Sequence, residues 1–294
     1  MNLITDADAL RPFAGCVFVP TMGALHEGHA SLIRHAAALR NALHGASKGP
    51  PVVVSIFVNP TQFDDPADLA RYPRTLDADL ALCRAGGADY AFVPSVETVY
   101  PPGVTIPTPP LPAAATEPRL EDALRPGHFA GVCQVVARLF AIVHPRTAVF
   151  GEKDFQQLAV IRGMVAASSR RPAIIPAPTV RERDGLAMSS RNRFIPPQKR
   201  AQAAAISRAL CEASAPAHHT PQRAEAAMRR VLLEAGFAAR DIQYAVVRDA
   251  ATLTAPRPGM PARALIAVNL PPVRLIDNAP WGDKQPQVNA DRRR

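Results

Sequence analysis

Aromatic residues, lysine and long apolar runs are all scarce in this chain of 294 residues. Only 5% of the residues are aromatic, and no apolar run reaches the roughly 18 residues that a membrane-spanning helix needs. The net charge is +9, but no dense basic run with interleaved aromatic side chains is present. The sequence therefore favours neither a membrane nor a nucleic acid as partner, and the charge points to smaller anions such as phosphates and acidic metabolites.

Cysteine is also rare. The four cysteines lie far apart, mostly within apolar runs, at Cys16, Cys83, Cys133 and Cys211. That pattern is typical of small buried hydrophobic residues in a reducing compartment, and it favours neither a disulfide framework nor a zinc site. No basic segment followed by an apolar core is found near residue 1, so we predict no signal peptide and expect a cytoplasmic protein.

Strand-like and helix-like segments alternate up to about residue 177. Strands are predicted at residues 16–20, 52–58, 90–93, 148–150 and 173–175, and helices at 28–44, 75–85, 132–143 and 155–165. The run from Val52 to Val58 is apolar throughout apart from Ser55, as in a strand buried on both faces of a parallel sheet. The alternation predicts an α/β fold with a Rossmann-like, doubly wound parallel sheet.

Two parts of the chain do not follow this alternation of strands and helices. Nine prolines between Val93 and Gly127 predict a long irregular excursion. Beyond residue 178, two predicted helices precede strands near 241–248, 263–269 and 273–276, which indicates a smaller α+β domain. We therefore expect domains at residues 1–178 and 179–294, the second lid-like, with a disordered polar tail from Gly282 onward.

Polar clusters follow four of the predicted strands. They lie at residues 21–29, 59–62, 151–154 and 180–192. Ligands of an open parallel sheet bind beyond the carboxyl ends of its strands, so these clusters are expected to meet at one edge. This convergence is a stronger indication of a site than any single cluster.

The first cluster contains His26 and His29 in the pattern HEGH. Their spacing of three residues differs from the HExxH zinc pattern, and Gly28 is a poor residue for a helix interior. At a helix N-terminus, such a pair could donate hydrogen bonds to phosphate, which the free N–H groups and the helix dipole also attract. Alternatively, either histidine could simply cap the helix or pack.

Two further clusters also suit phosphate. Lys153, in the segment GEKD, opens a predicted helix, where a cation opposes the helix dipole unless an anion bridges them. Ser189, Ser190 and Arg191 offer two hydroxyl groups and a guanidinium on a glycine-containing segment, as in a mobile phosphate clamp. The plainer alternatives are a surface ion pair of Lys153 with a neighbouring carboxylate and an ordinary polar turn.

The remaining clusters suit a second, partly neutral ligand. Asn59 and Gln62, in NPTQF, carry amides that could recognise hydroxyl and carboxylate groups, with Pro60 and Phe63 as an apolar wall. Arg125 and His128, in RPGHF, could reach over the site, although this segment also fits a simple turn.

The chain resembles the pantothenate synthetase (pantoate–β-alanine ligase) family at this point. PTMGALHEGH, VVVSIFVNPTQF, RYPRTLDADLALC, RPGHFAGV, VFGEKDFQQL and DGLAMSSRN occur in the order and spacing of that family, between about residues 16 and 195. The resemblance implies a HIGH-type nucleotidyl transferase fold, usually dimeric, and an ATP- and Mg²⁺-dependent condensation of pantoate with β-alanine. The implied intermediate is pantoyl adenylate, formed with release of pyrophosphate.

The resemblance also implies site residues. ATP contacts are expected from Met22, Gly23, Ala24, Leu25, His26, Glu27, Gly28, His29, Gly151, Glu152, Lys153, Asp154, Val180, Met188, Ser189, Ser190 and Arg191. The candidate catalytic residues are His26, His29, Lys153 and Arg191, with His29 similar to the family's proton donor. Candidate contacts of pantoate and β-alanine are Gln62, Gln157, Asn59, Arg125 and His128. Ligands of Mg²⁺ are not identified.

Two competing functions stay open at this stage. A cofactor adenylyltransferase with the same histidine pair is the nearer one, although Asn59, Gln62 and Gln157 suit pantoate better than a nucleotide base. A nucleic-acid-binding protein that reuses the fold is the more distant one. Related HIGH-type enzymes carry a KMSKS loop with two lysines, whereas the corresponding AMSSR has none. We therefore hypothesise that Lys153 supplies the missing ammonium.

Overall fold

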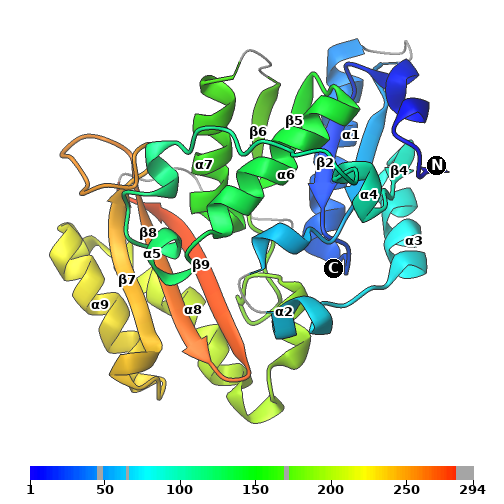
Figure 1. Cartoon of the computed structure of the whole chain (residues 1–294). Coiled ribbons are helices and arrows are strands. Elements are labelled where there is room, and N and C mark those ends of the chain that lie inside the picture. Colours follow the sequence, from blue (N-terminus) through cyan, green and yellow to red (C-terminus); the bar gives the residue numbers. More distant parts are fainter. Residues whose placement is uncertain (45–48, 64–65, 169–171, 283–294) are drawn as a thin grey trace. The chain divides into compact units, whose positions relative to one another are not determined.

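The structure is a computed structural model that describes residues 1–44, 49–63, 66–168 and 172–282. The chain folds into two compact units (Figure 1). Met1–Glu182 and Ala187–Arg193 form the first unit, and Arg183–Leu186 with the described residues from Phe194 onward form the second. The two units are described separately below.

The first unit is built on a six-stranded, fully parallel sheet. Its strands are β1 (Asn2–Ile4), β2 (Val17–Thr21), β3 (Val52–Ile56), β4 (Tyr90–Phe92), β5 (Thr147–Gly151) and β6 (Ala173–Ala177). They lie in the order β1-β4-β3-β2-β5-β6, so the direction of the strand order reverses between β2 and β5. Ligands of open α/β sheets bind at such a switch point. The predicted Rossmann-like parallel sheet is confirmed.

Helices cover both faces of this sheet. They are chiefly α1 (Glu27–His44), α3 (Leu76–Gly86), α6 (His128–Val143) and α7 (Phe155–Ala166). Successive side chains of a strand point to opposite faces. Val17 and Val19 of β2 therefore pack with Ile33 of α1, whereas Phe18 meets Phe140 of α6 with ring centroids 6.3 Å apart. The apolar strands are thus buried on both sides, as their composition predicts.

The proline-rich stretch between β4 and α6 contains only short helical turns, α4 (Val96–Val99) and α5 (Glu121–Leu124), besides one 3-10 turn. The buried Gln156 of α7 binds it: its amide nitrogen donates to the carbonyl oxygen of Ala114 (3.0 Å) and to Asp122 Oδ1 (2.9 Å). Its amide oxygen accepts the Glu121 N–H at 2.9 Å. A short helix, α2 (Pro66–Arg71), lies between β3 and α3. The predicted irregular excursion is present and is tied to α7.

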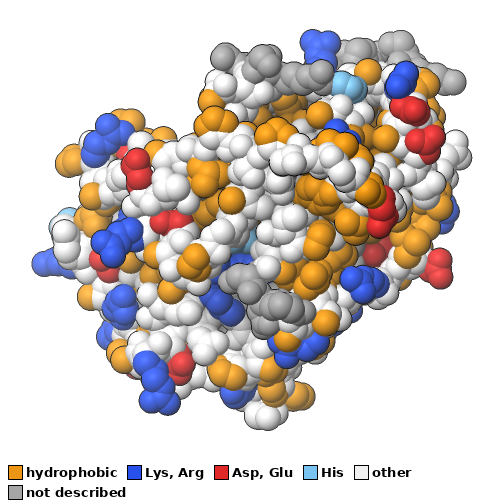
Figure 2. All heavy atoms as spheres, in the orientation of Figure 1, with side chains coloured by type: hydrophobic (Ala, Val, Ile, Leu, Met, Phe, Trp, Pro, Cys, Tyr) orange, Lys and Arg blue, Asp and Glu red, His pale blue; other side chains and the backbone are white. Residues whose placement is uncertain are grey.

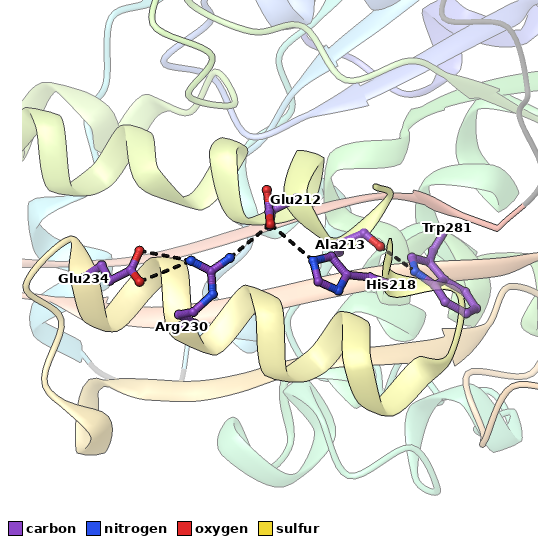
Figure 3. A network of polar contacts seen from close by, with 6 residues as sticks. All are labelled: Glu212, Ala213, His218, Arg230, Glu234 and Trp281. Carbon is purple, nitrogen blue, oxygen red and sulfur yellow. Dashed lines mark hydrogen bonds and ion pairs between the residues drawn. The ribbon is translucent and has the colours of Figure 1, made fainter. Parts of the chain in front are cut away.

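The second unit is a two-layer α+β structure. β7 (Ile242–Asp249), β8 (Ala262–Leu270) and β9 (Val273–Trp281) form an antiparallel sheet, and α8 (Arg200–Ala213) and α9 (Pro221–Glu234) pack on it. Polar contacts near the helix ends link α8 to α9 and to the turn between them, and one contact joins α8 to β9 (Figure 3). The Glu212 carboxylate pairs with Arg230 of α9 at 3.0 Å and with His218 at 3.2 Å, and the indole N–H of Trp281 donates to the Ala213 carbonyl at 2.8 Å.

The passage between the units differs from the predicted division at residue 178. The chain enters the second unit at residues 183–186, returns to the first at 187–193, and then leaves it again. The Met188 N–H donates to the Val180 carbonyl at 2.9 Å, and the Asn192 side-chain amide donates to Glu182 Oε1 at 2.6 Å, which keeps residues 187–193 with the first unit. The tail predicted to be disordered lies outside the described residues from position 283 onward.

Surface composition adds two observations. Figure 2 shows the Lys and Arg side chains of the visible face scattered among other residues, without one dense basic patch on that face. Within the described ranges, no helix combines the length and the apolar character that crossing a membrane requires.

Candidate active site

A cavity of about 240 Å³ lies at the carboxyl ends of the central strands of the first unit. All of its lining residues belong to that unit. It brings together members of all four polar clusters, namely Met22, His26, Gly28, His29, Asn59, Gln62, Gly151, Lys153, Asp154, Val180, Met188, Ser189, Ser190 and Arg191, and also Gln157. The other predicted site residues are not among those that line it: Gly23, Ala24, Leu25, Glu27, Glu152, Arg125 and His128.

The two histidines lie where β2 turns into α1. His26 Nδ1 accepts the N–H of Gly28 at 3.1 Å, and His29 Nδ1 accepts the N–H of His26 at 3.3 Å. The ring centroids are 4.1 Å apart. Because each Nδ1 is an acceptor, each neutral ring carries its proton on Nε2. His26 therefore caps the helix with one nitrogen and keeps the N–H of the other as a donor.

Burial lowers the pKa values of both histidines. The pKa of His26 falls to about 4, first through burial and then through the positive charge of Lys153. The pKa of His29 falls to about 3, again through burial and then through the neighbouring His26. Both rings are therefore neutral donors at pH 7 in the free protein, and a bound polyphosphate would raise both pKa values.

These lowered pKa values predict an acid-sensitive fold. An unfolded histidine titrates near 6.5, so protons bind the unfolded chain more tightly than the folded one. Above pH 6.5 neither state is protonated and the folded state keeps its full stability. As the pH falls from 6.5 toward 4, the unfolded chain is protonated first, so the free energy of unfolding decreases. Between pH 7.5 and 5, we expect the free energy of unfolding of a His29→Asn variant to fall by about 1–2 kcal/mol less than that of the unsubstituted protein.

Urea denaturation at the two pH values measures this difference. A matched variant, His35→Asn, alters a histidine of the same helix that does not line the cavity. Equal pH dependence in the His29→Asn variant and the unsubstituted protein would contradict the assignment of His29 as a neutral ring with a lowered pKa.

Lys153 and Asp154 form a charged pair in the cavity wall. They lie in a 3-10 turn directly after β5, with Lys153 Nζ 3.2 Å from Asp154 Oδ1 and the Lys153 side chain 21% exposed. Burial by itself would raise the pKa of Asp154, but Lys153 and Arg191 together outweigh this and hold the pKa below its usual value. The cavity therefore contains an ionised carboxylate beside two cationic side chains.

The predicted clamp segment, residues 188–191, follows a tight turn. Arg181 and Ala187 form an isolated antiparallel bridge, and the Arg191 N–H donates to Ser189 Oγ at 3.3 Å. The segment contacts Tyr72, a buried lining residue that sequence reasoning missed. Burial raises the pKa of the Tyr72 hydroxyl, while its hydrogen bond with Ser190 acts in the opposite direction.

Asn59 and Gln62 form one hydrogen-bonded unit. Asn59 is 1% exposed; its amide nitrogen donates to Gln62 Oε1 at 3.2 Å and to the Gly131 carbonyl at 3.3 Å. Tyr100 donates its hydroxyl hydrogen to Asn59 Oδ1 at 2.8 Å. The Gln62 amide nitrogen lies 3.1 Å from Met22 Sδ. Asn59 therefore anchors Gln62, and Gln62 presents its amide at the cavity.

Arg125 and His128 lie behind Gln62. Arg125 Nη1 is 3.2 Å from His128 Nε2, and His128 Nδ1 is 2.9 Å from the Gln62 carbonyl oxygen. A guanidinium can only donate, so Nε2 accepts and Nδ1–H donates to Gln62. This geometry supports the Gln62 backbone, and the predicted direct contact of Arg125 and His128 with substrate stays a prediction.

The apolar wall comes from other residues than the Pro60 and Phe63 that the sequence suggested. It consists mainly of one face of α6 together with Phe57 and Phe150, the α6 residues being Val132, Val135, Val136 and Leu139. Their helical spacing is visible in the sequence, but it equally fits a helix face buried in the core.

Gly131 allows α6 to approach the NPTQ turn. A Cβ added there would lie 2.8 Å from Gln62 Cα, and the Thr61 backbone is also in its way. We expect Gly131→Ala to destabilise the protein by about 1–3 kcal/mol, because backbone must move to relieve the overlap. Thermal or urea unfolding measures this. Gly151→Ala, where the nearest atom would be 3.7 Å away on Leu32, serves as the stability control. Equal stability of Gly131→Ala and the unsubstituted protein would show that α6 can move away from the NPTQ turn at no cost.

Comparisons with known proteins agree on one family. The family model described as pantoate-beta-alanine ligase matches residues 5–280. The chain is 50% identical over 268 residues to pantothenate synthetase of Nocardioides sp. strain JS614, covering 89% of this chain and 77% of that protein. It is 50% identical over 262 residues to pantothenate synthetase of Mycolicibacterium vanbaalenii, covering 89% and 80%.

Solved structures are also similar. The crystal structure of pantothenate synthetase from Thermus thermophilus has a TM-score of 0.83 and 40% identity, covering 95% of this chain and 99% of that one. The pantoate-beta-alanine ligase of Francisella tularensis, crystallised with beta-gamma ATP and beta-alanine, has a TM-score of 0.73 and 31% identity, covering 95% and 97%. The chain therefore belongs to the pantoate–β-alanine ligase family.

Proposed function

We propose that this enzyme condenses pantoate with β-alanine in two steps in the cavity of the first unit. The pantoate carboxylate attacks the α-phosphorus of ATP and displaces pyrophosphate, which leaves pantoyl adenylate. The neutral amine of β-alanine then attacks the acyl carbon, the bond to AMP breaks, and the nitrogen loses a proton, which leaves the amide of pantothenate. The observation that carries this proposal is the meeting of neutral imidazole donors, an ammonium and a guanidinium with side-chain amides in one cavity.

The first step requires positioning and neutralisation of charge rather than removal of a proton, since the carboxylate nucleophile is already ionised. We assign His26 and His29 as donors of Nε2–H to phosphate oxygens, and Lys153 and Arg191 as the cations that balance the charge developing on the triphosphate. The lowered pKa values of the two histidines fit donors better than general bases.

The second ligand occupies the other side of the cavity in this proposal. Gln62 and Gln157 offer amides that can recognise the hydroxyl and carboxylate groups of pantoate. The apolar α6 wall suits its methyl groups, and Asn59 and His128 hold Gln62 in place. β-Alanine must reach the same acyl carbon, so Gln62 is its expected neighbour too.

Magnesium fits this site as a companion of ATP. The described residues contain no group of three or more His, Cys, Asp or Glu side chains arranged to hold a metal ion. Mg²⁺ usually keeps phosphate and water ligands and takes only one or two carboxylates from a protein. We propose that the triphosphate supplies most of its ligands and that the ionised Asp154 is the protein carboxylate available to it. When bound, the ion neutralises phosphate charge.

We further propose a cytoplasmic homodimer whose second domain acts as a lid. All four cysteines are free thiols, which fits a reducing compartment. Leu3 on edge strand β1 and Val96 on α4 are exposed apolar side chains that a partner subunit could cover. A lid is chemically useful because an acyl adenylate hydrolyses in water. Light scattering tests the dimer, and X-ray scattering with and without ATP plus pantoate tests lid closure.

Pyrophosphate release in the absence of β-alanine tests the reaction itself. With ATP, Mg²⁺ and pantoate, we expect a burst of about one pyrophosphate per site, followed by AMP release only when β-alanine is added. Absence of a burst with pantoate and a panel of other acids would overturn the proposal. Transfer of AMP to a phosphorylated cofactor instead would favour the adenylyltransferase alternative.

A further inference from the structure

The loop that carries the histidine pair has an unusual backbone. Between the end of β2 at Thr21 and the start of α1 at Glu27, two successive residues have positive φ, 79° at Gly23 and 49° at Ala24. Glycine adopts this conformation readily, whereas alanine does so at a cost. Something outside the loop must therefore stabilise it.

Asp79 of α3 supplies that stabilisation. Its Oδ2 accepts the N–H of Ala24 at 3.0 Å, and its Oδ1 accepts the N–H of Leu25 at 2.8 Å. The Thr75 hydroxyl donates to Oδ1 at 3.0 Å. Asp79 is 2% exposed, and a buried carboxylate is costly unless hydrogen bonds compensate it. Both carboxylate oxygens of Asp79 therefore bind the same loop, although Asp79 lies 55 and 54 residues after Ala24 and Leu25 in the chain.

The loop transmits this restraint to the histidines. Ala24 and Leu25 do not line the cavity, but His26 follows directly, and its ring is held by the N–H of Gly28. The N–H of His26 in turn holds the ring of His29. A change of φ at Ala24 would therefore move both rings relative to Lys153 across the cavity.

We propose that Asp79 is a positioning residue for adenylate formation, which fixes the strand-to-helix loop so that the Nε2–H groups of His26 and His29 meet the triphosphate. The inference rests on the proposed function for the identity of the ligand, but not for the geometry of the loop. Asp79 itself does not line the cavity.

Asp79→Asn tests this inference with little change of volume. One of the two loop N–H groups would then face an amide NH₂, donor against donor. We expect the KM for ATP to rise about thirtyfold, while the KM for pantoate changes less than threefold. Asp77→Asn, on an exposed position of the same helix, is the control and should leave both constants unchanged.

A spectroscopic readout separates positioning from general stability. In ¹⁵N spectra of the unsubstituted enzyme, His26 and His29 should each show a protonated Nε2 and an unprotonated Nδ1 at pH 7. We expect Asp79→Asn to shift at least one histidine toward a tautomer mixture. This measurement needs no substrate, so it stands even if the proposed reaction is wrong.

Unchanged histidine signals together with an unchanged KM for ATP in folded Asp79→Asn would overturn the inference. If that variant does not fold, Asp79→Glu keeps the charge and displaces the carboxylate by one methylene. It should raise the KM for ATP several-fold and disturb the same histidine signals. Loss of thermal stability alone, with both readouts unchanged, would show a purely structural role.

Discussion

Replacing Lys153 with alanine is expected to slow adenylate formation by about a thousandfold, as for other groups that stabilise transition-state charge. Among the described residues that line the cavity, Lys153 is the only lysine, and the AMSSR segment supplies none. The variant should bind pantoate normally, since the neutral amides do not depend on the ammonium. Single-turnover pyrophosphate release measures the effect directly.

A bypass of the first step and a control variant show whether the effect of Lys153→Ala is specific to adenylate formation. Synthetic pantoyl adenylate supplied with β-alanine bypasses the first step, so Lys153→Ala should turn it over within a few-fold of the normal rate. Lys199→Ala removes a lysine of the second unit that donates to the Pro271 carbonyl at 2.9 Å, and it should leave adenylation unchanged. A near-normal adenylation rate in Lys153→Ala would remove Lys153 from the catalytic residues.

Gly28→Ala is expected to lower kcat/KM for ATP by about a hundredfold without loss of stability. A Cβ at this position would lie 2.8 Å from Cε1 and 2.9 Å from Nδ1 of His26, so the ring would have to swing away. Misplacement of a contacting group by about 1 Å can cost this much in rate. Alanine is at the same time the better helix former by about 0.5–1 kcal/mol, which offsets the lost cap.

A double-mutant cycle with His26→Ala identifies the cause. If Gly28→Ala acts by displacing His26, adding it to His26→Ala should cost little further activity, because the ring is already gone. Additive losses would mean that the new methyl group instead obstructs the nucleotide. Thermal unfolding of each variant checks that only folded enzyme is compared.

Much of the fold was readable from local pattern. A few residues are enough to indicate a strand or a helix by their apolar pattern. Examples are the run at residues 52–56, apolar apart from Ser55, and the helical spacing of Val132, Val135, Val136 and Leu139. β1 was missed because three residues, Asn2–Ile4, carry no period, and only the edge of β4 makes them a strand. The excursion of the chain at residues 183–186 was missed for the same reason.

Some residues of the candidate site were also predictable from the sequence and others were not. His26, His29, Lys153 and Gln62 were found because each follows a strand, and parallel strands bring their carboxyl ends to one edge. Tyr72 was not found, since nothing local distinguishes a buried tyrosine of the cavity from one of the core.

By itself, then, the sequence determined the parallel sheet, the α+β unit that follows it in the chain and the meeting of four polar clusters at one sheet edge. These follow from periodicity and chain direction, which are local properties. Only the tertiary structure decided that Asp79 holds the histidine loop, that His128 supports Gln62 from behind, and that α6 forms the apolar wall. Each of these depends on contacts between residues far apart in the chain, and no local pattern encodes which distant side chain will be packed against a given backbone.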